Sequence, residues 1–486
     1  MSPPSTPIGL AAAATLALLL STPGCAWFAR QARPEPPAAT PAPRPNTPAA
    51  PSAELWVMPE DPSEAEPALR ALLVHAKEAK LPVAIAGARQ SLGGQAFAPG
   101  GIVVDMRLYR GLSLDAKARV LTVRAGTRWK EVLPYLHQQG LSPMVMQATN
   151  DFSVGGSLSA NCHGLQPGAP MAQSVLSFKL MLADGRVVTC SRSERSELFK
   201  LAIGGYGLFG VILEARLRVV PNARYRLQRH FVKAEAFAQT FATHGANAAL
   251  AYGRLSVAPG SFLREAILTL HAPAPGKFAY QPLPDPAPIA VNRLRYWRDA
   301  IRSPGGKLAL WEAEKRADTG LRQDYATRNE LLNAAAEDLA AVGVEGTLVR
   351  QTYFLPRPML AAFIAHARQL LPDHQVDLLE AGVVAVSRDD ETVLRYADQP
   401  MFALTLVFHQ ARNDAAEADM AKLTQDLNDA ALALSGRFYL PYRLHATTRQ
   451  FRLAYPQSAT FFAAKRRYDP DERFQSQFYL KYGQAP

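Results

Sequence analysis

The sequence is poor in cysteine and lacks several motifs that identify common protein classes. Its 486 residues include three cysteines, Cys25, Cys162 and Cys190, and no C-x-x-C pair, which excludes a disulfide framework and gives no sign of a metal site. No G-x-G-x-x-G follows a first strand and opens a helix, and the P-loop pattern G-x-x-x-x-G-K-S/T is absent. The Rossmann and P-loop modes of nucleotide binding are therefore excluded.

Long basic segments are also missing, although the chain is basic overall. The formal net charge is +11, from 53 Lys and Arg against 42 Asp and Glu. The arginines are scattered, and the only dense basic run is Lys465-Arg466-Arg467. No zinc-knuckle spacing, RNP-like aromatic block or long basic helix accompanies it, so we expect no nucleic-acid partner. A basic surface, or attraction to an anionic membrane or substrate, explains the charge.

The N-terminal apolar run is too short to span a membrane comfortably. Residues 8–20 (IGLAAAATLALLL) have the length of a signal-peptide core, and STPGCAW then places Cys25 behind small residues, as in a bacterial lipobox. The run has no Lys or Arg before it, and Thr22 stands where the motif usually has Leu. A plain signal peptide or a misassigned start codon is the alternative. We predict export, with lipid anchoring at Cys25 to the bacterial membrane facing the periplasm, and a Pro/Ala-rich linker over residues 26–52.

The pattern from residue 53 onward is that of a folded α/β layer. Apolar residues recur at helical spacing over 62–80 and 129–139, and strands are expected at 82–86, 100–106 and 119–129. This order predicts a small layer of strands buried by helices.

Three glycine-rich stretches each lie next to an expected strand. They cover residues 87–94, 155–164 and 204–210, and the last directly precedes a strand at 211–219. One such loop is weak evidence, because glycine also serves ordinary turns. Three within a short distance indicate one elongated anion lying across several loop ends, and a dinucleotide such as FAD fits.

The segment 223–435 has a different sequence pattern, with no glycine-rich loop. Helices are expected at 326–342, 358–371 and 414–434, alternating with strands at 348–355 and 402–408. The period of a strand places Arg350, Thr352 and Phe354 on one face of the first strand, and it places Ala403, Thr405 and Val407 on one face of the second.

Four motifs in order resemble one family. AGARQSLGGQ, VGGSLSANCHG, IGGYGLFGVI and the terminal KRRYDPDERFQSQFYLKYG are similar to FAD-binding oxidoreductases of the vanillyl-alcohol oxidase/PCMH type. The ending GRFYLPYR looks most similar to the decaprenylphosphoryl-ribose oxidase and aldonolactone/alditol oxidase branches. The resemblance implies an α+β protein with a two-subdomain PCMH-type FAD-binding domain and an α/β cap domain with an antiparallel sheet. The implied domains are a signal peptide (1–25), a linker (26–52), the FAD-binding domain (53–222), the cap or substrate domain (223–435) and a C-terminal return to the FAD domain (436–486).

The same resemblance implies which residues contact FAD. The loop after the second strand would wrap the pyrophosphate, the second glycine loop would flank the diphosphate and the isoalloxazine, and the third would face the adenine. The implied cofactor residues are Ala86, Gly87, Ala88, Arg89, Gln90, Ser91, Gln95, Ser153, Val154, Gly155, Gly156, Ala160, Asn161, Cys162, His163, Gly207, Gly210, Val211, Ile212 and Tyr439. His163 as a core residue and Tyr439 as a packing residue are the alternatives.

Gln90 bears on how FAD is attached. Covalent members of the family resemble GHS at this loop, and the histidine is their attachment point. Here the position is Gln90, whose amide is not a nucleophile, and SPMVMQATN lacks the second attachment cysteine. The resemblance therefore implies noncovalent FAD.

The chemistry implied is hydride transfer from an alcohol-type carbon of a sugar, alditol, lactone or hydroxy acid to flavin N5, with a protein group removing the heteroatom proton. Arg350 and Thr352 are candidates for substrate contact, and Tyr442 or His445 for the proton acceptor, with Glu380 weaker. Arg350 in an apolar strand needs a partner, either substrate or a carboxylate, unless it lies at a solvated face.

Two other functions remain as alternatives. One is a catalytically inactive FAD-binding lipoprotein with a structural or binding role. The other is a nucleotide-binding reductase, which would need an NAD(P)H loop that we do not find. The partners expected are a small-molecule substrate and an electron acceptor, with oxygen, a quinone and a protein as the alternatives for the acceptor.

Overall fold

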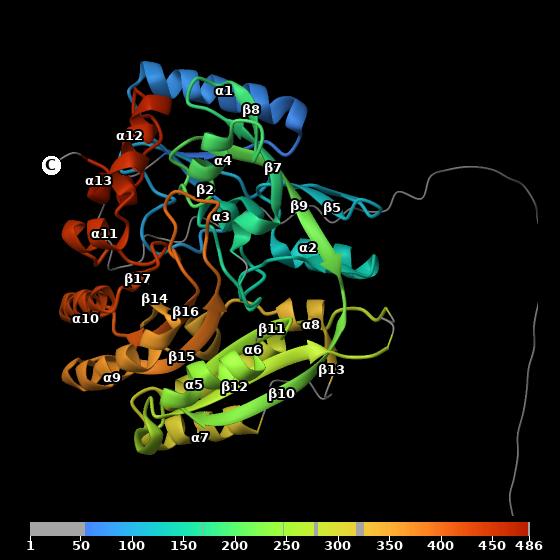
Figure 1. The fold of residues 1–486 in the computed structure, drawn as a ribbon. Helices are drawn as coiled ribbons and strands as arrows, with labels where there is room; N and C mark the ends of the chain where they lie inside the picture. Colours follow the sequence, from blue (N-terminus) through green and yellow to red (C-terminus); the bar gives the residue numbers. More distant parts are fainter. Residues whose placement is uncertain (1–53, 169, 246, 277–279, 317–324, 485–486) are drawn as a thin grey trace, which may run out of the picture. The chain divides into compact units, whose positions relative to one another are not determined.

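A computed structural model describes residues 54–168, 170–245, 247–276, 280–316 and 325–484 (Figure 1). The signal peptide, Cys25 and the linker predicted for residues 1–52 lie outside these residues. The described strands form three sheets, one of them parallel and one a large antiparallel sheet. The expected α+β class with an antiparallel cap sheet is confirmed.

The parallel sheet contains three strands in the order β1-β3-β2. Its strands are β1 (Glu54–Val57), β2 (Val83–Ala86) and β3 (Ile102–Asp105). Helix α1 (Pro62–Glu78) precedes β2; Asp61 caps its first turn by accepting from the Ser63 N–H at 2.8 Å. Its apolar residues at helical spacing are all buried, so the predictions of helix 62–80 and of the two strands are confirmed.

A second sheet completes the N-terminal part. Five strands lie in the order β4-β5-β9-β7-β8, and β6 pairs with β9. The predicted strand 119–129 is shorter than expected and belongs to this sheet as β5 rather than to the layer of β2 and β3, because it pairs with β4 and β9. The strands are β4 (Leu112–Asp115), β5 (Val120–Arg124), β6 (Leu141–Pro143), β7 (Val175–Met181), β8 (Val187–Ser191) and β9 (Val211–Pro221). The helices are α2 (Trp129–Gln138), α3 (Val154–Ser159) and α4 (Ser196–Ala202).

The eight-stranded antiparallel sheet has the order β13-β10-β12-β11-β15-β16-β14-β17. The strands are β10 (Arg224–Lys233), β11 (Leu250–Leu255), β12 (Glu265–Pro273), β13 (Tyr325–Thr327), β14 (Thr347–Pro356), β15 (Asp377–Val386), β16 (Met401–Gln410) and β17 (Arg437–Phe438). The helices are α5 (Phe237–His244), α6 (Ala287–Ala300), α7 (Pro304–Lys315), α8 (Arg328–Leu332), α9 (Leu360–Leu370) and α10 (Asp414–Ala433). The predictions of strands 348–355 and 402–408 and of helices 358–371 and 414–434 are confirmed.

The helix predicted over 326–342 is wrong. Helix α8 is capped by Thr327 and ends at Leu332, and an irregular segment follows it. In that segment the Ala334 carbonyl accepts from the Asn150 N–H at 2.7 Å, and the Ala336 N–H donates to Asp151 at 2.7 Å. The alanine-rich sequence favours helix locally, but these contacts with the N-terminal part engage its backbone instead.

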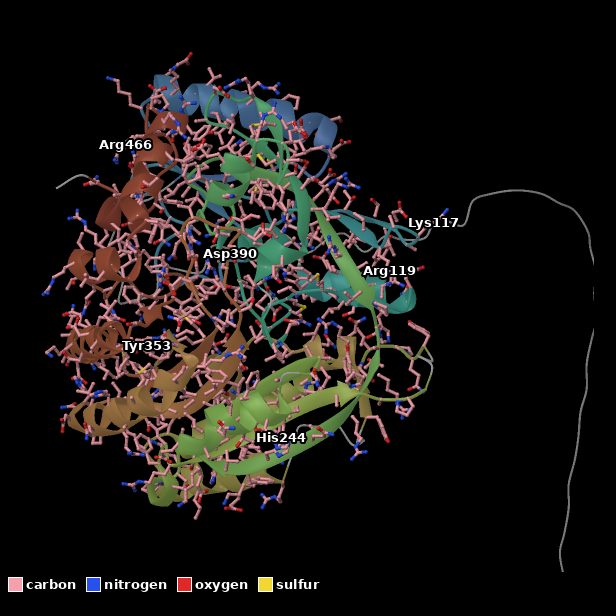
Figure 2. All side chains as sticks on the ribbon, viewed as in Figure 1. Lys117, Arg119, His244, Tyr353, Asp390 and Arg466 are labelled. Carbon is pink, nitrogen blue, oxygen red and sulfur yellow. The ribbon has the colours of Figure 1, made fainter. Side chains whose placement is uncertain are left out.

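The C-terminal segment returns to the N-terminal sheets. It forms α11 (Thr448–Ala454), α12 (Ser458–Tyr468) and α13 (Gln477–Tyr482), and Phe474 pairs with Val83 of β2. The basic run lies on α12, where Lys465 is buried against Asp469 and Arg466 donates to the Gly483 carbonyl (Figure 2). No helix within the described residues has the length and apolar character needed to cross a bilayer.

Candidate functional site

The first predicted glycine loop follows β2 and contacts the start of α3. A Cβ on Gly87 would lie 2.0 Å from the Ser153 hydroxyl oxygen, so the close approach requires glycine. Ser153 caps α3 by accepting from the Gly156 N–H at 3.4 Å, and it also accepts from the Ala88 N–H at 3.2 Å. One side chain therefore joins the first and second glycine loops.

The third glycine loop lies against the same elements. The Gly204 N–H donates to the Leu158 carbonyl of α3 at 3.0 Å. Gly207 has φ +76°, and its Cβ would lie 3.1 Å from Ile85 of β2. The three loops thus meet around β2 and α3, as binding of one elongated anion requires.

The implied residues fall on a few elements. In the FAD-binding part, Ala86 to Ser91 lie at the end of β2 and in its loop, Ser153 to Ala160 lie on α3 and its caps, and Asn161, Cys162 and His163 directly follow α3. Gly207 and Gly210 lie in the third loop, and Val211 and Ile212 lie on β9, which pairs with β7. Arg350 and Thr352 lie on β14, and Tyr439, Tyr442 and His445 follow β17.

The side chains of Gln95 and Asn161, two of the implied cofactor residues, are engaged on both their donor and acceptor atoms by the protein. The Gln95 amide donates to the Leu440 carbonyl at 2.6 Å and accepts from the Gly93 N–H at 3.1 Å. The Asn161 amide donates to Asp389 at 2.9 Å and accepts from the Ala172 N–H at 3.1 Å. Both join distant segments around the glycine loops, which the sequence patterns did not indicate.

Arg89 and Gln90 differ in exposure. Arg89 has φ +56° and pairs with buried Asp105 at 3.3 Å, while Gln90 is exposed. Burial raises the pKa of Asp105, but hydrogen bonds and charge from Arg107, with the charge of Arg89, lower it overall, so the carboxylate stays ionised.

Four rings from both parts of the chain form an aromatic cluster, defined here as His163, Phe354, Tyr396 and Tyr439. Phe354 stacks on Tyr396 with centroids 4.4 Å apart, and His163 lies 5.4 Å from both Phe354 and Tyr439. The Tyr439 hydroxyl donates to the Ala160 carbonyl at 3.0 Å, and its N–H to the Thr352 carbonyl at 2.9 Å. Burial lowers the pKa of His163 to about 4, so its ring is neutral at pH 7.

Several buried polar atoms around these loops have no hydrogen-bond partner among the residues that the structure describes. They are Arg89 Nε, His163 Nδ1, both amide atoms of Gln166, Ser387 Oγ and Tyr396 OH. Buried polar groups are nearly always hydrogen bonded, so such atoms indicate a ligand or water. Together with the glycine contacts, they fit a flavin dinucleotide with polar edges and a large ring system. Among the described residues, no group of three or more His, Cys, Asp or Glu is arranged to hold a metal ion.

A second group of side chains, the hydroxyl cluster, consists of Thr352, Thr405 and Tyr442. The Thr352 hydroxyl is hydrogen bonded to the Thr405 hydroxyl at 2.8 Å and to the Tyr442 hydroxyl at 3.1 Å. The Tyr442 ring lies edge-on to Tyr439, with centroids 5.8 Å apart. Burial raises the pKa of Tyr442, so the phenol is neutral near pH 7 and suits hydrogen bonding better than proton removal.

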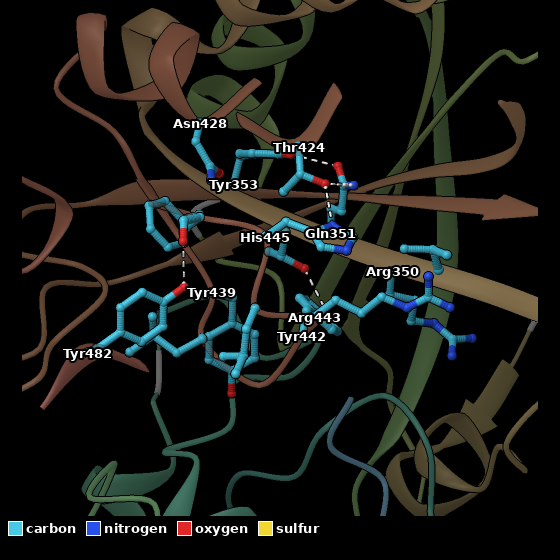
Figure 3. Close-up of a pocket in the computed structure, with 16 residues that line it drawn as sticks. Arg350, Gln351, Tyr353, Thr424, Asn428, Tyr439, Tyr442, Arg443, His445 and Tyr482 are labelled. Carbon is cyan, nitrogen blue, oxygen red and sulfur yellow. Dashed lines mark hydrogen bonds between the residues drawn. The ribbon is translucent and has the colours of Figure 1, made fainter. Parts of the chain in front are cut away.

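His445 lies beside Gln351 and Thr424, on the α10 side of β14 (Figure 3). Its Nδ1 contacts the Thr424 hydroxyl of α10 at 3.0 Å, and Gln351, which alternates with Thr352 along β14, donates to the same hydroxyl at 2.7 Å. His445 Nε2 contacts Glu417 at 2.8 Å. Both ring nitrogens are therefore engaged, and the geometry does not favour the candidate role of His445 as proton acceptor.

Arg350 has the carboxylate partner that the sequence left open. Its guanidinium pairs with Glu337 at 2.6 Å, and Glu337 also pairs with Arg293 of α6 at 2.9 Å. Glu380, the weaker catalytic candidate, pairs with Arg254 of β11 at 2.6 Å. Both carboxylates are paired with arginines. The charge of Arg350 is therefore compensated within the protein and does not require an anionic substrate.

Cys162 is buried beside the aromatic cluster. Burial raises the pKa of its thiol to about 11, so the thiol is protonated at neutral pH and is a poor nucleophile. Sequence reasoning missed Tyr396, Ser387, Gln166 and Glu337. None stands in a motif or an alternating strand pattern, and only the fold brings each to the site.

The fold is α+β, and its glycine loops and buried polar atoms suit a dinucleotide. Residues 56–191 match the family model described as FAD binding domain, which confirms the PCMH-type resemblance at this level. This part of the chain is therefore similar to FAD-binding domains.

Three curated proteins illustrate the range of similarity. Cytokinin dehydrogenase 7 of Oryza sativa subsp. japonica is 37% identical over 147 residues, 29% of this chain and 28% of that protein. Cytokinin dehydrogenase 2 of Arabidopsis thaliana is 35% identical over 137 residues, 28% of this chain and 27% of that protein. L-gulonolactone oxidase of Mus musculus is 28% identical over 217 residues, 41% of this chain and 48% of that protein. The matches thus span less than half of each relative.

Proposed function

We propose that this chain is an FAD-dependent oxidoreductase that takes hydride from the alcohol-type carbon of a sugar, alditol, lactone or hydroxy acid. The observation that carries the proposal is the hydroxyl cluster, which joins β14, β16 and the segment after β17, next to an aromatic cluster that includes His163 of the FAD-binding part. The names of the relatives support oxidation chemistry: one is an oxidase of L-gulonolactone, and the others are dehydrogenases of cytokinin.

The protein's part in this reaction is binding and orientation. FAD, when bound, supplies a two-electron acceptor for hydride. The neutral phenol of Tyr442 is held by Thr352 and can donate to, or accept from, the hydroxyl of a substrate. Tyr439, fixed to the Ala160 carbonyl, and Phe354 with Tyr396 supply apolar walls that exclude water beside it.

We further propose that FAD is held without a covalent bond. Gln90 stands where the resemblance puts an attachment histidine, and its amide cannot form such a link. Acid or heat denaturation is expected to release all yellow flavin into the supernatant. Flavin remaining on the precipitated protein would contradict this.

The activity is tested by anaerobic spectroscopy of the purified protein. Sugar alcohols, lactones and hydroxy acids are added in turn, and bleaching of flavin absorbance reports hydride transfer. Oxygen, a quinone and a protein acceptor are then compared for reoxidation. A protein that keeps FAD but is bleached by none of these substrates supports the alternative, an inactive FAD-binding lipoprotein.

The cellular location is also a proposal. The apolar run and Cys25 support export and lipid anchoring, with the Pro/Ala-rich segment as a tether between the anchor and the folded part. The FAD domain would then work at the periplasmic side of a bacterial membrane.

A further inference from the structure

One face of the antiparallel sheet carries a row of polar residues. Thr352 lies opposite Thr405, and Thr405 lies opposite Gly382, which in turn lies opposite Arg254. In the next row Val407 lies between Arg350 and Glu380 and is opposite both. Residues opposite one another in register share a face. We call these residues the cap floor: Arg254, Arg350, Thr352, Glu380, Gly382 and Thr405.

The cap floor adjoins the FAD-binding domain at one end. Phe354, two residues along β14 from Thr352, contacts His163 and Tyr439. Glu337, which pairs with Arg350, directly follows the segment whose backbone bonds to Asn150 and Asp151. A substrate presented to flavin by the cap would therefore lie against the cap floor.

Every arginine of the cap floor is matched by a carboxylate. Arg350 shares Glu337 with Arg293, and Arg254 pairs with Glu380 at 2.6 Å and with Glu314 at 3.8 Å. Three arginines thus face three glutamates. Gly382 leaves room for the Arg254 side chain in the row of Thr352, because a Cβ at position 382 would lie 2.6 Å from the Arg254 guanidinium.

The Arg350–Glu337 pair is ionised at neutral pH. Burial raises the pKa of Glu337, but the charges of Arg350 and Arg293 lower it overall, so the carboxylate is ionised. Burial lowers the pKa of Arg350, but Glu337 raises it overall. Glu337 and Arg350 are therefore both charged, and they balance each other by ion pairing rather than by protonation of the carboxylate.

We infer that the site selects an uncharged, hydroxyl-bearing substrate and rejects one that carries a carboxylate or phosphate at its reacting end. Moving an anion out of water is costly unless a cation receives it, and the arginines here already have anionic partners. The hydroxyl cluster, in contrast, matches a substrate hydroxyl as both donor and acceptor. This inference rests on the proposed function and narrows it by excluding hydroxy acids.

Matched pairs of probes test the inference: xylitol against xylonate, and galactono-1,4-lactone against galactonate. Binding is read from the perturbation of the oxidised flavin spectrum, separately from anaerobic bleaching. The neutral member of each pair is expected to bind at least about tenfold more tightly. Glu337→Gln, which leaves Arg350 and Arg293 uncompensated, is expected to shift the ratio toward the anion by about tenfold or more.

Two further variants control the test. Glu380→Gln removes the closest carboxylate partner of Arg254 and should shift the ratio of neutral to anionic affinity in the same direction. It therefore tests the inference even if the Glu337→Gln protein does not fold. Glu194→Gln removes an equal charge from an exposed pair with Arg195 and should leave the ratio unchanged.

The outcomes separate the two proposals. Tighter binding of the anion by the unmodified protein, a flavin spectrum insensitive to both neutral probes, or ratios unmoved in both glutamate variants would overturn the inference. Neutral probes that perturb the spectrum without bleaching it would uphold the inference and contradict the proposed oxidation.

Discussion

At the scale of single residues, the two proton-acceptor candidates of the sequence fall into different environments. Tyr442 belongs to the hydroxyl cluster next to Tyr439, whereas His445 is engaged on the α10 side by Glu417 and Thr424. Tyr442 and His445 are only three positions apart in sequence, yet they contact side chains on opposite faces of β14. Tyr442 is therefore the better candidate for contact with substrate.

Tyr442→Phe is expected to slow anaerobic flavin reduction about 10- to 100-fold, the scale of losing one hydrogen bond to a reacting oxygen. Its ring packing and FAD content should be retained, since only a hydroxyl is removed. Stopped-flow bleaching measures the rate. Tyr468→Phe, which removes a hydroxyl bonded to Glu197 on the surface, is the control. An unchanged rate in the Tyr442 variant would show that this face is not the substrate face.

At the scale of elements, the loop after β2 and the segment after β17 form one hydrogen-bonded unit. Gln95 donates to the Leu440 carbonyl, and the Leu92 N–H donates to the Pro441 carbonyl at 2.7 Å. The loop assigned to FAD binding therefore positions the segment that carries Tyr439 and Tyr442.

Gln95→Ala is expected to destabilise the protein by about 1–3 kcal/mol, because it leaves a buried carbonyl and N–H without partners. It should also weaken FAD binding, since the loop loses its anchor. Thermal unfolding and flavin titration measure the two effects. Gln228→Ala, at an exposed position of β10, should change neither. Full stability and affinity in the Gln95 variant would mean that the loop is held by other contacts.

The segment after β17 is also attached to α10 by a pair that depends on pH. Burial raises the pKa of Glu417, but hydrogen bonds from His445 and Gln410 and the charge of Arg443 lower it overall, to about 2 from an ordinary 4.5. Because the folded-state pKa is the lower one, this stabilisation is present above about pH 4.5 and is lost as the pH falls toward 2.

Glu417→Gln is therefore expected to lower stability at neutral pH by at most about 3 kcal/mol and to flatten the loss of stability between pH 4.5 and 2. Unfolding free energies measured from pH 6 to pH 2 provide the comparison. If the free energy of unfolding fell equally steeply between pH 4.5 and pH 2 in both proteins, Glu417 would contribute nothing to acid sensitivity.

At the scale of the whole molecule, distant parts of the chain complete the FAD-binding region. Phe474 pairs with Val83, and the buried Lys465–Asp469 pair lies within the returning segment. The proposed lipid anchor lies at the opposite end of the chain from this segment.

Cys25→Ala is expected to move the protein from the membrane fraction to the soluble periplasm, because it removes the thiol that would carry lipid. Fractionation and mass spectrometry of the mature N-terminus measure this. The variant should keep its FAD, since the change lies far outside the glycine loops. An intact Met1 in the cytoplasm would contradict both export and anchoring.

The sequence by itself determined the features that depend on local chemistry. Gly87, Gly156 and Gly207 indicate positions where the backbone comes close to neighbouring atoms. The period of two along β14 places Arg350, Thr352 and Phe354 on one face. The prediction of a helix over 326–342 was wrong because helix propensity of alanine acts locally. The competing contacts with Asn150 and Asp151 come from residues far away in the sequence.

Only the tertiary structure decided which side chains meet. Gln95 and Leu440 are 345 positions apart, and Asn161 and Asp389 are 228 apart. Tyr396 enters the aromatic cluster from a segment with no periodic pattern, and Glu337 compensates Arg350 from outside the strand. The physical reason is that burial and charge pairing depend on distance in space, which neither propensity nor periodicity along one segment encodes.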